Sequence, residues 1–113
     1  MGIDFSHCDA RWAYSGFMRF RERLAATVGI IDFSKIERTD DKRLYKIKND
    51  PLYYILAHSD CDGNLTVEEC RKLAPRLKEV LSTWPDDYDK LMGLKLVDGM
   101  LNAVENNEPL EFL

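Results

Sequence analysis

The residues best suited to chemistry lie in one short segment near the middle of the chain. Asp60 and Asp62 are two residues apart, Gly63 follows, and Glu69 stands at the start of the next apolar pattern. Carboxylate and carbonyl oxygens are the ligands that calcium prefers, and a glycine lets the chain turn sharply around the ion. The spacing therefore predicts a calcium site. Its predicted ligands are Asp60, Asp62, the carbonyl of Asn64 and Glu69, with His58 at the entrance of the loop.

The same segment is also explained without a metal. An Asp-Gly pair turns the chain by itself. Thr66 and Glu69 form the pattern of a capping box, in which each side chain binds a backbone amide at the start of a helix. Only Asp60 and Asp62 then argue for an ion. Both interpretations stay open, and the structural turn is the favoured one.

Cysteine and histidine offer a further alternative in the same region. His58 and Cys61 have the spacing of zinc ligands, and folding is able to bring Cys70, His7 or Cys8 near them. A small enzyme that uses His58 and Cys61 rests on their adjacency alone. Neighbouring carboxylates raise the pKa of a thiol, which weakens it as a nucleophile. Zinc and catalysis are therefore minor hypotheses.

Several elements must position this segment. Apolar residues at helical spacing predict helices at 17–28 with Ser15 as N-cap, from Pro51, at 67–84, and at 88–105. Alternating residues at 2–7 and 110–112 predict short strands that pair the two termini. The last helix has a wide apolar arc, which predicts a largely buried helix.

Two charged stretches are predicted to face solvent. The polar side of the first helix carries Arg19, Arg21, Glu22 and Arg23, where the alternative is an anion or partner site. The run from Glu37 to Lys48 mixes both signs, so we interpret it as a solvated connector in preference to a docking site.

Length and composition limit the class of protein. The 113 residues predict a single domain, 1–113, and 45% hydrophobic residues argue against disorder. A net charge of −4 disfavours nucleic acid as a partner. No apolar run is long enough to span a membrane, and no secretory signal pattern opens the chain. Three cysteines leave one unpaired in any disulfide scheme, so we expect thiols and a cytoplasmic location.

The central segment resembles an EF-hand loop. Laid on that pattern, His58 takes the first place, Gly63 the sixth, Leu65 the eighth and Glu69 the twelfth. The family uses aspartate at the first place, so His58 is a departure that lowers the expected calcium affinity. No second loop of this kind follows, although EF-hands usually work in pairs.

Three stretches together resemble small uncharacterised proteins of bacteria and their phages. They are the opening Met-Gly-Ile-Asp-Phe-Ser-His with Arg-Trp-Ala-Tyr-Ser-Gly-Phe-Met-Arg-Phe, the central His-Ser-Asp-Cys-Asp-Gly-Asn-Leu-Thr, and the closing Glu-Pro-Leu-Glu-Phe. This resemblance implies a bacterial or phage setting and no particular mechanism.

The sequence therefore predicts a mainly α fold: a compact bundle of about four helices with an EF-hand-like helix-loop-helix and a minor β pair from the termini. The expected function is that of a small soluble binding protein with an unidentified protein partner and weak calcium binding at most. The alternative is a metal-independent phage inhibitor or adaptor of a host protein. The sequence does not specify an oligomeric state.

Overall fold

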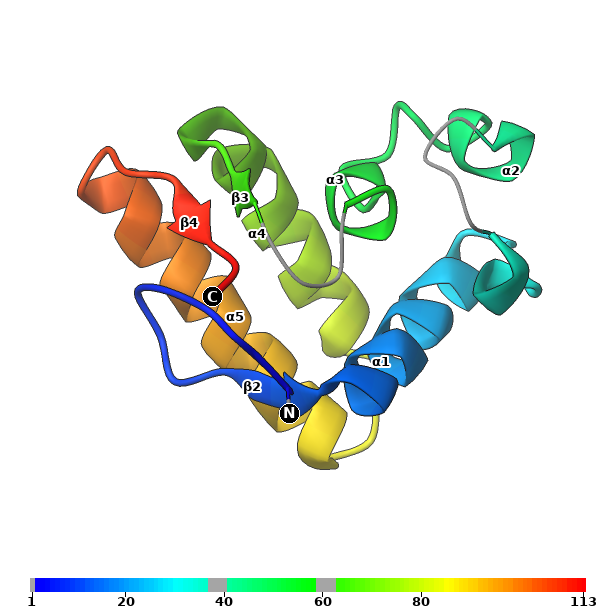
Figure 1. Cartoon of the computed structure of the whole chain (residues 1–113), viewed down its shortest axis with the longest axis horizontal. Helices are drawn as coiled ribbons and strands as arrows, with labels where there is room; N and C mark the ends of the chain where they lie inside the picture. Colours follow the sequence, from blue (N-terminus) through cyan, green and yellow to red (C-terminus); the bar gives the residue numbers. More distant parts are fainter. Residues whose placement is uncertain (1, 37–40, 59–62) are drawn as a thin grey trace.

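The computed structural model of the chain describes residues 2–36, 41–58 and 63–113. Within these residues the fold is mainly α with minor strand pairing, which confirms the predicted fold class (Figure 1). The long helices are α1 (Tyr14–Thr27), α4 (Val67–Leu81) and α5 (Tyr88–Glu105). The shorter elements are β1 (Gly2–Asp4), β2 (Arg11–Ala13), a 3-10 turn (Phe33–Lys35), α2 (Lys42–Tyr45), α3 (Tyr53–Leu56), β3 (Asn64–Leu65) and β4 (Leu110–Glu111).

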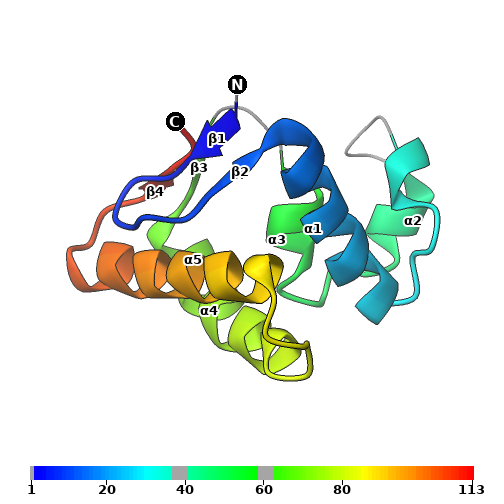
Figure 2. The same cartoon turned by 90° about the horizontal axis from the view of Figure 1, so that it is seen from below.

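Helices α4 and α5 lie side by side, and α1 packs near the end where the chain passes from α4 to α5 (Figures 1 and 2). Gly93 makes this meeting of three helices close. A Cβ atom there would stand 2.8 Å from a methyl carbon of Leu81 and 3.2 Å from the ring of Phe20. Because both distances are shorter than ordinary contact, a side chain at this position would force Leu81 and Phe20 to move.

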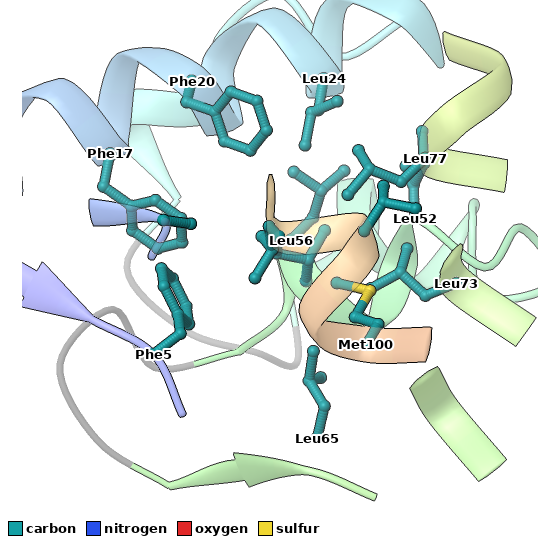
Figure 3. Close-up of a cluster of buried hydrophobic side chains, with 14 of the residues drawn as sticks. Phe5, Phe17, Phe20, Leu24, Leu52, Leu56, Leu65, Leu73, Leu77 and Met100 are labelled. Atoms are coloured by element: carbon teal, nitrogen blue, oxygen red, sulfur yellow. The ribbon is translucent and has the colours of Figure 1, made fainter. Parts of the chain in front are cut away.

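The core lies between the three long helices and continues under the strands (Figure 3). Phe17, Phe20 and Leu24 come from α1, and Leu73 and Leu77 face them from α4. All five side chains have no exposed surface. Their spacing along each helix is that of one helical face, so the apolar periodicity of the sequence predicts this part of the core correctly.

The strands form two antiparallel pairs, each of which contains one terminal strand. β1 pairs with β2, and β4 pairs with β3. The two termini meet through one bridge between Phe5 and Phe112, where Leu113 N–H also donates to the Asp4 carbonyl at 2.8 Å. The termini thus lie together as predicted, but each terminal strand finds its main partner elsewhere. The pairing of β2 escaped the sequence analysis because three residues are too few to show alternation.

Two further details differ from the sequence prediction. Helix α1 begins at Tyr14 after Ala13, so Ser15 is not its N-cap and no side chain caps its first turn. Helix α5 is less buried than its wide apolar arc predicts, because Leu91 and Leu101 are about half exposed, at 54% and 49%. The core uses only part of that arc, and these two leucines remain on the surface of α5 with the exposed Asp98 between them.

Candidate functional site

The central loop connects the end of α3 at Leu56 with β3 and the start of α4. Of the predicted metal ligands, the structure places His58, Asn64 and Glu69. Asp60 and Asp62 lie outside the described residues, as does Cys61. The described part of the loop therefore shows what these three ligand candidates do, and the carboxylate pair stays a prediction.

Glu69 has a structural role at the start of α4. Its Oε1 accepts a hydrogen bond from Thr66 N–H at 2.9 Å, and Glu69 N–H donates to Thr66 Oγ1 at 3.1 Å. This is the capping box that the sequence predicts, and it satisfies two amides that the helix itself leaves without acceptors. A bidentate calcium ligand needs both oxygens turned toward the ion, so capping and ligation make competing demands on this carboxylate.

The imidazole of His58 bridges both sides of the loop. Its Nε2 lies 2.8 Å from the carbonyl oxygen of Asn64. Because a carbonyl only accepts, this contact requires a proton on Nε2. The ring also stacks on Phe112, with centroids 4.1 Å apart and planes inclined by 19°. His58 thus engages the same carbonyl that the sequence assigns to calcium, and it ties the loop to the C-terminal segment.

Two described residues, Gly63 and Leu65, hold places in the EF-hand pattern of the sequence. Gly63 has a φ of +89°, a conformation that favours glycine, and this residue holds the sixth place of the pattern. Leu65, at the eighth place, is fully buried and pairs with Leu110. The Gly63 carbonyl accepts from Phe112 N–H at 2.9 Å. The C-terminal segment therefore supplies the strand against which this single loop is held.

Arg21 is a neighbour of the loop whose burial was not predicted from the sequence. It was predicted on the exposed face of α1, but it is only 5% exposed. Its guanidinium donates to the carbonyls of Leu56 and His58, both at 2.7 Å, and lies between the rings of Phe17 and Phe33. The signal was in the spacing, because Arg21 is four residues after Phe17 on the apolar face.

The position of Arg21 changes the electrostatics of the loop. A guanidinium carries a permanent positive charge, and this one binds the carbonyl of His58, the first place of the EF-hand pattern. Arg21 therefore holds the backbone at the start of the loop and places a positive charge beside the carbonyl of His58.

The other described cysteine and histidine candidates are Cys8, Cys70 and His7, and each contacts other parts of the protein. Cys70 is fully buried, and burial raises the pKa of its thiol to about 11. Burial also raises the pKa of Cys8. The ring of His7 lies 2.7 Å from Ser6 Oγ and 3.1 Å from Glu108, on the loop after β1. Within the described ranges, no three His, Cys, Asp or Glu side chains are grouped closely enough to hold a metal ion.

Comparisons of the chain with protein-family models, with curated proteins and with solved structures give no match. Among the described residues, no helix is both long and apolar enough to cross a membrane. The resemblance to bacterial and phage proteins and to an EF-hand stays an expectation, so the proposed function rests on the chemistry of the surface.

Proposed function

We propose that the protein works by binding another protein through the exposed side of α5. We call this surface the α5 face and define it by four residues. They are Tyr88, Leu91, Leu94 and Leu101. The observation that carries the proposal is the group of apolar side chains of α5 that the core leaves uncovered. Tyr88, Leu91 and Leu101 are 55%, 54% and 49% exposed.

A group of uncovered apolar side chains on a helix is costly in water unless a partner covers it. Single exposed apolar residues are common on protein surfaces, but here two of them, Tyr88 and Leu91, are one helical turn apart beside the half-buried Leu94. Tyrosine and leucine-lined surfaces of this kind match the apolar centre of protein interfaces.

A hydrogen bond fixes the position of the Tyr88 side chain. Its hydroxyl donates to the Arg11 carbonyl at 2.8 Å, which fixes the ring beside the strands. Tyr88 lines two surface hollows of about 470 and 400 Å³, one shared with Cys8 and one shared with Leu94. A ring that is fixed before binding loses little conformational entropy when a partner packs on it, so Tyr88 is suited to be the anchor of the interface.

The charges around the α5 face indicate the chemistry of the partner. Residues 86–105 contain five acidic and two basic side chains. Arg23 pairs with Asp87 and Asp89, whereas Asp98 and Glu105 are exposed. The complementary partner is a protein segment with apolar side chains flanked by basic ones, such as an amphipathic helix.

The test compares the wild type with the double variant Leu91→Glu/Leu101→Glu. Both positions are exposed, so the stability should change by no more than about 0.5 kcal/mol each. The wild-type protein is immobilised and used to recover partners from a lysate of its source organism. Each recovered protein is then purified and titrated against the wild type and the double variant. We expect at least about a tenfold loss of affinity in the double variant, because two buried contacts become charged.

The control is Ile31→Glu, which changes an equally apolar residue that is 92% exposed and lies outside α5. Equal binding by the wild type, the control and the double variant would overturn the proposal. Self-association of the wild type, seen by sedimentation and lost in the double variant, would instead assign the face to a second copy and would also contradict a separate partner.

A second candidate function is weak calcium binding by the central loop. The proposed ligands are Asp60, Asp62, the Asn64 carbonyl and Glu69. The positive φ of Gly63 and the buried Leu65 support it, since both suit the places they hold in the EF-hand pattern. The hydrogen bond of His58 to the Asn64 carbonyl opposes it, because it engages one of the proposed ligands, and this is why the α5 face is preferred.

A further inference from the structure

We infer that the turn from Lys42 to Lys48 is a second interaction surface and that it binds an acidic segment of a protein. We call these seven residues the basic turn. The inference does not depend on the α5 face, because a different element and a different kind of contact carry it. Figure 1 shows α2, which opens the basic turn, at the opposite side of the molecule from α5.

The basic turn differs from the rest of the chain in its charge composition. Its seven residues hold four of the 16 basic side chains and none of the 20 acidic ones, so the other residues hold 12 basic against 20 acidic side chains. The mixed run in the sequence predicted a solvated connector. In the structure, the described part of that run contains one arginine that forms ion pairs and three exposed lysines.

Arg43 is the paired member. It binds the carboxylates of Asp41 and Asp32, and its backbone N–H donates to Asp41 at 2.8 Å. These hydrogen bonds from Arg43 lower the pKa of Asp41 to about 2. Arg43 and Asp41 therefore hold the start of α2 and are not available to a partner.

The lysines are the available members. Lys42, Lys46 and Lys48 are exposed, and among the described carboxylates none lies within ion-pair distance of them. Tyr45 stands between them, 62% exposed, with Lys48 Nζ 4.2 Å from its ring centre and 2.8 Å from its hydroxyl. Leu44 is 1% exposed and anchors the turn to the core. The result is a fixed basic surface with one aromatic ring.

An acidic protein segment fits this surface better than a nucleic acid does. Three lysines suit carboxylates as point-charge donors, and the tyrosine ring offers an apolar contact of the kind found at protein hot spots. Nucleic acids need a longer positive track, because many phosphates must be neutralised together.

The test measures fluorescence anisotropy with a labelled synthetic peptide of repeated Glu-Glu-Leu units and the full-length protein. We expect saturable binding that weakens as salt rises, because the contact is largely between charges. The variant Lys42→Glu/Lys46→Glu should lose at least about tenfold in affinity, and Tyr45→Ala about threefold or more. The matched control, Lys72→Glu/Lys78→Glu, changes two exposed lysines of α4 and should lose much less.

Several outcomes would overturn the inference. They are no binding of the peptide, an equal loss in the α4 control, and tighter binding of a single-stranded DNA of the same total charge. Salt-sensitive self-association that Lys42→Glu/Lys46→Glu abolishes would assign the turn to a second copy instead. Thermal unfolding of each variant shows whether it is folded. Loss of peptide binding by Leu91→Glu/Leu101→Glu would contradict the independence of the two surfaces.

Discussion

Arg21 is the only buried charged side chain among the residues that the structure describes. A buried cation is tolerated only where hydrogen bonds and partner groups replace the lost water. Here the carbonyls of Leu56 and His58 and the faces of two phenylalanine rings surround the guanidinium. One side chain of α1 thus holds the end of α3 and the beginning of the central loop.

Replacing Arg21 with leucine should destabilise the fold by roughly 2–4 kcal/mol, because two carbonyls lose a charged donor. Denaturant unfolding at neutral pH measures the loss. The exposed Arg19 on the same helix serves as control, and Arg19→Leu should change the free energy of unfolding by about 0.5 kcal/mol or less. Equal losses in the two variants would show that Arg21 contributes no more than a surface arginine.

At the scale of elements, the C-terminal segment completes the structure around the loop. Leu110 is fully buried against Leu65, and Phe112 packs between His58 and the aromatic rings of Phe5 and Phe17. β4 is the strand partner of β3, which follows the loop.

Deleting residues 110–113 should therefore cost about 3–6 kcal/mol, since two large side chains lose their burial at about 1.5–3 kcal/mol each. The melting temperature should fall by well over ten degrees in a domain of this size. Leu113→Ala is the control, because Leu113 is 66% exposed and should matter little. An unchanged melting temperature after the deletion would mean that the tail does not pack as described.

The helices show how far local sequence patterns reach. The stripe of α4 and its capping box at Thr66 and Glu69 were predictable, because both depend on residues within a few turns of each other. The partners of the buried Arg21 and the stacking of His58 on Phe112 were not, because each depends on residues far apart in the chain. Tertiary contacts decide which polar residues enter a core, and spacing alone cannot name their partners.

At the scale of the whole molecule, the two proposed surfaces have opposite character. The α5 face is apolar with acidic neighbours, and the basic turn presents lysines around Tyr45. The loop between α3 and α4 lies between them along the chain, and its described contacts are made with the protein's own groups. The two proposals together predict that one copy of the chain can contact two proteins at once.

The most direct test of whether the loop has a structural role or binds calcium is thermal unfolding with and without calcium. If the loop bound calcium with a Kd near 10⁻⁴ M, about 10 mM calcium would add roughly 2.7 kcal/mol of stability. The melting temperature would then rise by about ten degrees or more, and Glu69→Gln would abolish the rise while keeping the capping bond. We expect no rise, or one of a few degrees, in the wild type. A full rise in the wild type that disappears in Glu69→Gln would contradict the structural role and establish the loop as a calcium site.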